Sequence, residues 1–303
     1  MNNNINGIIN VYKEAGYTSF DVVAKMRGIA GQRKIGHTGT LDPDATGVLP
    51  IVLGNATKLV DMLTEKNKEY VAEFVLGKVT DTQDISGEVL RECEVNCEKT
   101  EVEAAIKSFV GDILQIPPMY SAIKVDGKRL YELAREGKEV ERKARAITIH
   151  EIDILTIDIP NIKIRVNCSK GTYIRTLCND IGEKLGCGAT MTSLERTASG
   201  RFGIKDAYKL SELQLLKDEG RLTEAVLKVD KVFEDYAAVK LSGEALRLAK
   251  NGNILTRKEM VNSIAEDGNR DCLRVYDENG DFFALYRACD GGKRYKADKM
   301  FPT

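Results

Sequence analysis

Residues 36–54 read GHTGTLDPDATGVLPIVLG, and this stretch decides how the rest of the chain is interpreted. Its four glycines and two prolines interrupt it too often for a long helix, so it predicts a structured loop leading into a buried strand over 48–53. Asp42 lies at its centre, and Pro43 restricts the residue before it to extended conformations. The Asp42 carboxylate is therefore held in few directions, as a preorganised catalytic group requires.

Asp42 and its loop can also be interpreted in three different ways. Asp-Pro and glycine-rich stretches often form simple turns, in which Asp42 has no chemical role. A phosphate-binding loop does not fit the spacing, because no Gly-Lys-Ser/Thr follows and no G-x-G-x-x-G is present. A glycoside hydrolase needs two carboxylates that flank the bond, and Asp42 and Asp44 supply them only if both face one pocket.

The composition predicts one large domain and one small domain, because the chain has 303 residues with 43% hydrophobic content. It contains no apolar run long enough to span a bilayer, and its first residues do not resemble a secretory signal. Seven cysteines without regular spacing indicate a reduced, cytoplasmic protein. Cys93 and Cys97 can share a helix face but lack a second ligand pair, so we predict no metal site.

The net charge of −1 does not by itself indicate a nucleic-acid partner. The charges are unevenly distributed, because residues 61–120 carry 6 Lys/Arg and 13 Asp/Glu, whereas residues 121–147 carry 8 and 5. An acidic segment beside a basic one fits a solvated side and an RNA-facing side. The same counts fit ordinary mixed charge on exposed helices.

Hydrophobic periodicity predicts an α+β chain. Alternation and short apolar runs predict strands over 6–12, 70–76, 147–159, 161–168, 272–276 and 282–286. Helical spacing and stop signals predict helices over 20–29, 100–110, 173–185, 211–216 and 243–250. Thr18 or Ser19 can cap the first helix, and capping boxes are predicted at Thr100–Glu103 and Ser211–Gln214.

The pattern GHTGTLDPxATGVLP over 36–50 resembles the signature of the TruB family of pseudouridine synthases. These enzymes convert one uridine in the T loop of tRNA, at position 55, to pseudouridine, without a cofactor. The resemblance implies that Asp42 is the catalytic aspartate and that His37 contacts the T loop near the flipped base. Without it, His37 is a loop histidine bonded to the backbone. Asp44 falls at a position that varies in the family, so we expect it to be solvated.

A second stretch, CSKGTYIRTLCNDIGEKLG over 168–186, is also similar to this family. The similarity implies that Arg175 pairs with Asp42 and that Tyr173 contacts the substrate. An arginine partner lowers the pKa of a carboxylate and fixes its orientation, so we expect Asp42 to stay ionised. From the residues alone, Arg175 fits a surface arginine paired with Asp180 or Glu183.

Four further residues match family positions in or around the active site. The resemblance implies that Tyr70, at the start of its strand, lies against the target base and that Leu194 lines the uracil pocket. Without it, both fit ordinary core positions. The resemblance also implies that Lys124, in the Tyr-Ser-Ala-x-Lys stretch of residues 120–124, belongs to an RNA-binding lid, whereas the residues alone also fit an amphipathic helix with solvated charges. Lys13 matches the opening Lys-x-x-Gly-x-Thr-Ser and is expected to support the active-site loop, although Glu14 replaces the usual proline.

The resemblance also implies the architecture. We expect a pseudouridine synthase fold over 1–236, with a central mixed, mostly antiparallel sheet flanked by helices and a lid insertion at about 120–147. LRVYDENGDFFALYR over 273–287 resembles the PUA module, so 237–303 is predicted to form a small PUA-like β-barrel that binds RNA. The expected partner is the T arm of tRNA, bound by a monomer that needs no guide RNA.

Two alternatives from different classes stay open. A tRNA-binding or tRNA-folding chaperone with dispensable catalysis would tolerate damage at Asp42, Tyr70 or Arg175, and all three are intact. A guide-RNA-dependent relative shares the Leu-Asp-Pro motif, but the insertion over 120–147 argues against it.

Overall fold

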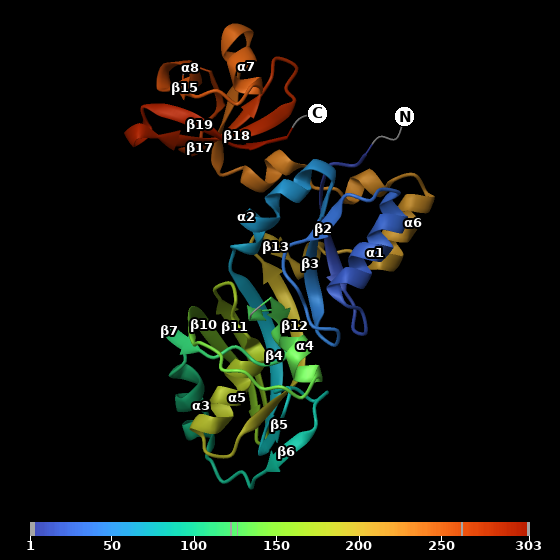
Figure 1. Ribbon diagram of the computed structural model, residues 1–303, viewed down its shortest axis with the longest axis vertical. Helices are drawn as coiled ribbons and strands as arrows, with labels where there is room; N and C mark the ends of the chain where they lie inside the picture. Colours follow the sequence, from blue (N-terminus) through green and yellow to red (C-terminus); the bar gives the residue numbers. More distant parts are fainter. Residues whose placement is uncertain (1–3, 122, 126, 262, 302–303) are drawn as a thin grey trace.

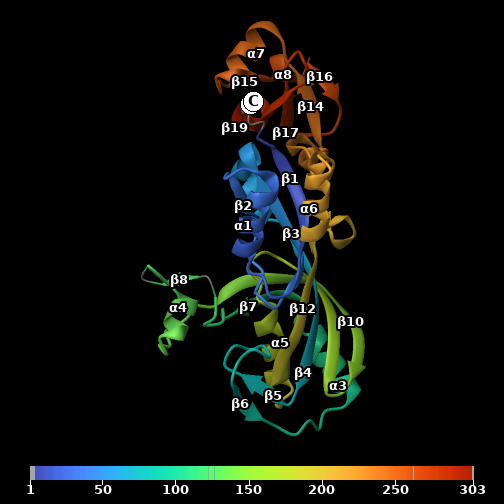
Figure 2. The same cartoon turned by 90° about the vertical axis from the view of Figure 1, so that its right-hand side faces the viewer.

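The computed structural model describes residues 4–121, 123–125, 127–261 and 263–301 (Figure 1). The molecule is elongated (Figures 1 and 2). The C-terminal sheet forms one end, α1 (Ser19–Ala30) lies in the middle, and α3 (Lys99–Lys107) and α5 (Ile174–Lys184) lie at the other end. No helix in the described part of the chain is long and apolar enough to cross a membrane.

The main sheet has nine strands. They are β1 (Gly7–Lys13), β2 (Ile35–His37), β3 (Thr46–Leu53), β4 (Lys68–Leu76), β7 (Gly111–Gln115), β10 (Arg145–Asp158), β11 (Asn161–Cys168), β12 (Ala189–Ser199) and β13 (Phe202–Gly203). The hydrogen-bonded order is β1–β3–β12–β4–β11–β10–β7, with β2 on β3 and β13 on β12. β3 and β12 run parallel, whereas the other described pairs are antiparallel, so the predicted mixed, mostly antiparallel sheet is confirmed.

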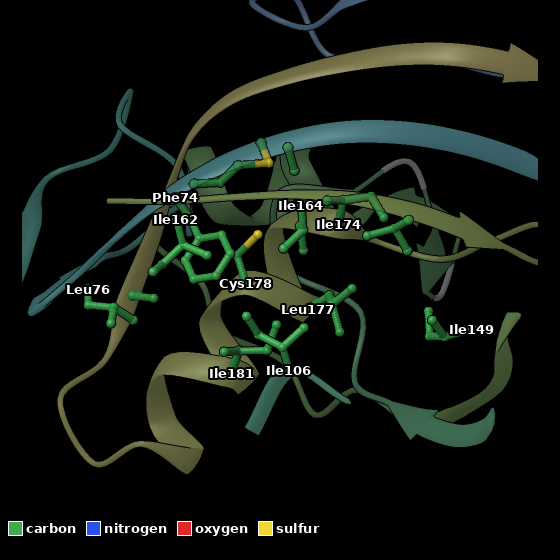
Figure 3. Packing of buried hydrophobic residues seen from close by; sticks show 14 of the residues in the cluster. Phe74, Leu76, Ile106, Ile149, Ile162, Ile164, Ile174, Leu177, Cys178 and Ile181 are labelled. Atoms are coloured by element: carbon green, nitrogen blue, oxygen red, sulfur yellow. The ribbon is translucent and has the colours of Figure 1, made fainter. Parts of the chain in front are cut away.

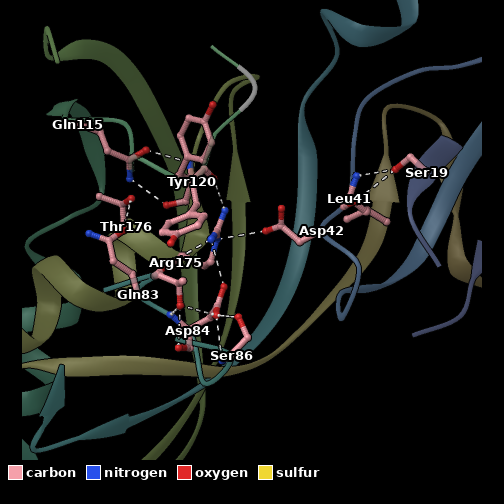
Figure 4. A network of polar contacts seen from close by, with 12 residues as sticks. Ser19, Leu41, Asp42, Gln83, Asp84, Ser86, Gln115, Tyr120, Arg175 and Thr176 are labelled. Atoms are coloured by element: carbon pink, nitrogen blue, oxygen red, sulfur yellow. Dashed lines mark hydrogen bonds and ion pairs between the residues drawn. The ribbon is translucent and has the colours of Figure 1, made fainter. Parts of the chain in front are cut away.

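Two apolar cores lie along this sheet. Helices α5 and α3 cover β4, β10 and β11, where Leu177 and Ile181 pack into the first core (Figure 3). Helices α1 and α6 (Leu210–Asp218) cover β1 and β3, where Val23 and Met26 pack into the second core. The loop that carries Asp42 joins two strands of the second core and faces the α5 end of the first (Figure 4).

Helices α3 and α6 begin earlier than predicted. The Glu98 N–H donates to the Glu101 carboxylate, and the Lys209 N–H donates to the Glu212 carboxylate, each over 2.7 Å. The capping boxes predicted at Thr100–Glu103 and Ser211–Gln214 are therefore wrong by two residues. Glutamate and lysine are not usual N-cap residues. The capping-box pattern therefore indicated the next Thr or Ser along the sequence in each case.

The part of the insertion that contains α4 projects from the body of the molecule, whereas its last residues, from Arg145 on, lie in β10 of the main sheet (Figure 2). It contains β8 (Lys124–Val125), β9 (Lys128–Arg129) and α4 (Leu130–Arg135). The predicted contact residue Lys124 lies in β8, and its side chain is outside what the structure describes. Shorter elements elsewhere are η1 (Gly54–Leu59), α2 (Val60–Thr64), β5 (Lys78–Thr80), β6 (Val89–Glu92), η2 (Ile204–Asp206), η3 (Leu222–Ala225) and η4 (Val229–Phe233).

The C-terminal segment forms a second sheet. Its elements are β14 (Tyr236–Lys240), α7 (Gly243–Lys250), β15 (Leu255–Thr256), α8 (Arg257–Val261), β16 (Ile264–Glu266), β17 (Asn269–Tyr276), β18 (Phe282–Cys289), η5 (Asp290–Gly292) and β19 (Arg294–Met300). The strand order is β15–β19–β18–β17–β14–β16. Leu285 and Phe301 from this segment share a core with Ile8 and Val52 of the main sheet, so the two parts are packed together.

Candidate active site

The Asp42 loop connects β2 to β3, and two buried side chains, Ser19 and Lys13, hydrogen-bond to its backbone. The Leu41 N–H donates to the Ser19 hydroxyl over 2.9 Å. The Lys13 ammonium donates to the carbonyls of Pro43 and Ala45 over 2.8 and 2.6 Å. Because Lys13 is 0% exposed, it supports the loop, as inferred from the sequence, and offers no surface to RNA. Burial lowers the pKa of Lys13 to about 8.

Arg175 contacts the catalytic candidate directly. Its Nε lies 3.1 Å from Asp42 Oδ2, so the predicted pairing is confirmed (Figure 4). The same guanidinium lies 3.1 Å from Asp84 Oδ2 and donates to the Tyr120 carbonyl over 2.9 Å. The Arg175 side chain is 7% exposed, whereas that of Asp42 is 44% exposed. Asp42 is therefore held from one side and open to a ligand on the other.

Asp84 is a residue of this site that the sequence did not single out. Its carboxylate accepts from Arg175, from the Ser86 hydroxyl over 2.5 Å and from the Thr82 hydroxyl over 2.8 Å. It also accepts the Ser86 N–H over 3.1 Å. These bonds fix the carboxylate, which in turn orients Arg175 toward Asp42. The sequence signal that could have found Asp84 is the cluster of polar residues over 80–84, which follows the strand over 70–76.

The pKa of Asp42 is shifted in the direction opposite to the expected one. Burial raises the pKa of Asp42 above its ordinary value, Arg175 opposes this, and the nearby Asp84 charge adds to it. The expectation that Arg175 leaves Asp42 with a lowered pKa is therefore wrong, because desolvation outweighs the ion pair. Asp44 is exposed, as expected, and does not share the buried side of the loop.

Tyr70 and Leu194 come from the neighbouring strands β4 and β12. Tyr70 lies opposite Arg196, and Leu194 lies opposite Ala72, so both side chains project from one face of the sheet. Both are half-buried and pack against the core beneath α5. Burial raises the pKa of Tyr70, and the Asp42 charge adds to this. Tyr70 is thus a core aromatic that also lies within electrostatic range of Asp42.

His37, in β2, and Tyr173, directly before α5, are both half-buried. The His37 ring meets Phe20 edge to face, with centroids 5.4 Å apart. Burial and the Arg196 charge lower the pKa of His37 below its ordinary value, so the imidazole is neutral at pH 7. The Tyr173 backbone exchanges hydrogen bonds with the Gln115 side chain over 2.8 and 3.0 Å. Burial raises the pKa of Tyr173.

Known proteins resemble this chain over nearly its whole length. A family model described as TruB family pseudouridylate synthase (N terminal domain) matches residues 27–174. A model described as tRNA pseudouridylate synthase B C-terminal domain matches residues 175–234. Curated relatives named tRNA pseudouridine synthase B include one from Clostridium novyi, 49% identical over 93% of this chain and 95% of its own length. Another, from Lachnoclostridium phytofermentans, is 47% identical over 98% of this chain and 100% of its own length.

Solved structures also resemble the chain. One is the structure of an H/ACA RNP bound to a substrate RNA containing 2′-deoxyuridine, with 25% identity and a TM-score of 0.72. It covers 98% of this chain and 85% of its own. An archaeal box H/ACA sRNP Nop10–Cbf5 complex has 28% identity and a TM-score of 0.70, covering 98% of this chain and 86% of its own.

Proposed function

Because the chain belongs to the TruB family of tRNA pseudouridine synthases, it isomerises uridine in tRNA, and we propose that its target is the uridine at position 55 in the T loop. The protein is therefore an isomerase. The observation that carries the proposed site is the Asp42 carboxylate, held by Arg175 and open to a ligand. Asp84 supports this arrangement from the far side of the guanidinium.

In the proposed mechanism, the target nucleotide is flipped out of the folded loop, at a cost of a few kcal/mol. Asp42 acts at the ribose while the C1′–N1 bond breaks, the base turns over and C1′ joins C5. Substrate and product are isomers, so the reaction balances without a co-substrate. Tyr70 stacks on uracil, His37 contacts the T loop, and Leu194 helps to exclude water while the glycosidic bond is open.

We also propose a role for each part of the chain. Residues 1–236 form the catalytic domain, the insertion over 120–147 is a lid with which Lys124 contacts RNA, and 237–303 form a PUA-like RNA-binding domain. The Tyr120 carbonyl bond to Arg175 supports the lid assignment, because it ties the start of the insertion to the site. The proposed partner is the T arm, bound by a monomer without guide RNA in the cytoplasm. The seven free thiols among the described residues support that location.

The test uses a T-arm stem-loop carrying uridine tritiated at C5, because tritium leaves when C1′ joins C5. The wild-type protein is expected to release tritium from this stem-loop without any guide RNA, whereas Asp42→Asn is not. Release only from whole tRNA would correct the T-arm assignment. Release only with an added guide RNA would favour the guide-dependent alternative, and tight binding without release would favour a chaperone.

A further inference from the structure

A second buried arginine lies beneath the Asp42 loop, and the sequence did not single it out. We propose that Arg196 is a positioning residue that joins the Asp42 loop to Tyr70 and so fixes the spacing between the two groups at the substrate. The inference rests on the proposed roles of Asp42 and Tyr70. It differs from the Arg175 pair because Arg196 contacts the frame of the site, not the Asp42 carboxylate.

The Arg196 guanidinium binds both ends of the loop. Its Nε donates to the Val48 carbonyl over 2.7 Å, its Nη2 to the Gly39 carbonyl over 3.2 Å and its Nη1 to the Thr40 carbonyl over 3.4 Å. The side chain is 1% exposed. Because the donors of a guanidinium are fixed in one plane, these bonds hold residues 39–48 as a closed unit with Asp42 at its tip.

The same guanidinium reaches Tyr70. Arg196 and Tyr70 are directly opposed on β12 and β4, so their side chains are neighbours on one face. The positive charge of Arg196 favours the ionised form of the Tyr70 hydroxyl and so opposes the rise in its pKa that burial causes. One side chain therefore binds the loop of the proposed aspartate and lies beside the proposed stacking tyrosine.

Two glycines of the loop lie where it approaches Arg196. Gly47 lies opposite Arg196 in the parallel pairing of β3 and β12, and a Cβ on Gly47 would lie 2.2 Å from the Arg196 carbonyl oxygen. Gly47 also has φ of +103° and Gly39 has φ of +120°, conformations that other residues rarely adopt. Glycines at both positions let the loop close over the guanidinium.

The partners of Arg196 distinguish it from an ordinary structural ion pair. In the described part of the chain, Arg196 donates hydrogen bonds to backbone carbonyls. A buried charge without a carboxylate partner is costly, and here the bonds of the planar guanidinium to the two ends of the loop offset that cost. The charge also lowers the pKa of His37, so it affects the proposed T-loop contact as well as Tyr70.

The first test is Arg196→Lys, which keeps the charge but cannot bridge all these acceptors. We expect the single-turnover rate at saturating enzyme to fall about 100-fold, as for small misplacements of catalytic groups, with RNA affinity nearly unchanged. The matched control is Arg274→Lys. Arg274 is 3% exposed, donates to the Tyr236 carbonyl over 2.9 Å and pairs with Glu266. The Arg274→Lys variant should lose a comparable amount of unfolding free energy and keep the wild-type rate. Both variants are assayed at a temperature at which circular dichroism shows them to be folded.

The second test combines Arg196→Lys with Tyr70→Phe. If Arg196 acts through Tyr70, the double variant loses less than the product of the two single losses. A wild-type rate in folded Arg196→Lys, or losses that simply multiply, would overturn the proposal. Should Arg196→Lys fail to fold, Arg196→Gln enters the same cycle. Absence of tritium release from the wild type on both the stem-loop and whole tRNA would instead overturn the proposed function, whereas full activity in Asp42→Asn would overturn the proposed role of Asp42.

Discussion

Asp42 carries its charge where the folded protein disfavours it. Burial raises its pKa, so the folded state prefers the protonated form more than the unfolded state does. The stability from this group is fully present below its unfolded pKa and is lost as the pH rises through the folded pKa. At neutral pH, far above the unfolded pKa, this group therefore destabilises the fold.

We accordingly expect Asp42→Asn to abolish tritium release, keep RNA binding and raise the unfolding midpoint at pH 7. The gain in midpoint should shrink as the pH falls and disappear below about pH 4, where the wild-type carboxyl is also neutral. Circular dichroism melting across this range measures it. An equal or lower midpoint at pH 7 would show that the Arg175 ion pair outweighs desolvation.

Arg175 is expected to stabilise the site as well as serve it. Arg175→Ala removes the cation between Asp42 and Asp84, and the Asp84 side chain, 17% exposed, then loses its charged partner. We expect a loss of about 3 kcal/mol in unfolding free energy, at the low end for buried pairs because Asp42 is 44% exposed. Tritium release should also be lost. Urea denaturation measures the stability.

The control is Arg221→Ala, which removes an exposed arginine paired with Glu219 and Glu224. Exposed ion pairs contribute little to stability, so this variant should unfold almost as wild type does. Equal losses in the two variants would mean that Arg175 behaves as an ordinary surface arginine.

Long motifs located Asp42 and Arg175, but not the residues that hold them. Asp84 meets Arg175 across 91 positions of sequence, and Arg196 meets Val48 across 148. Local pattern carries no information about such contacts, because they depend on which strands become neighbours. The direction of the Asp42 pKa shift was missed for a related reason. It depends on how deeply the carboxyl group is buried, and burial is a property of the folded chain.

At the scale of the element, the Asp42 loop depends on its contact with β12. Gly47→Ala places a Cβ against the Arg196 backbone in a strained conformation, so β3 and β12 must separate. We expect a destabilisation of about 3 kcal/mol and loss of tritium release, because overpacking and backbone strain add. Thermal melting and the tritium assay measure the two effects.

Gly220→Ala is the matched control. Gly220 also has positive φ, at +73°, but a Cβ there meets nothing within 4 Å. This substitution should lower the unfolding free energy only by the cost of backbone strain, about 1–2 kcal/mol, and the activity should be kept. If both variants behave alike, the contact between β3 and β12 is not what shapes the loop.

Element types were predictable, and their boundaries were less so. The alternation over 161–168 matches β11, and Thr18 caps α1 by accepting the Asp21 N–H over 3.1 Å. The starts of α3 and α6 were missed because glutamate side chains close those ends on residues outside the usual capping set. The pairing of β8 with β9 was not anticipated either, since strands this short leave no periodic pattern.

At the scale of the whole molecule, the C-terminal sheet is expected to support the catalytic part. Leu285 is 0% exposed and packs in a core with Ile8 and Val52 of β1 and β3. Leu285→Ala should cost about 2–5 kcal/mol, the usual range for such a cavity. Because β3 continues the Asp42 loop, hydrogen exchange should speed up in β1 and β3 as well as in β18, and tritium release should slow.

Leu273→Ala is the control that tests whether the effect of Leu285→Ala depends on the core shared with the main sheet. Leu273 is also 0% exposed, but it packs in the core of the C-terminal sheet alone. Its loss should speed exchange in β17 and β18 while β1, β3 and tritium release stay near wild type. If Leu285→Ala gives this same confined pattern, the two parts fold independently and the C-terminal sheet acts only through RNA. If exchange spreads into β3, the sheet helps to hold Asp42 in place.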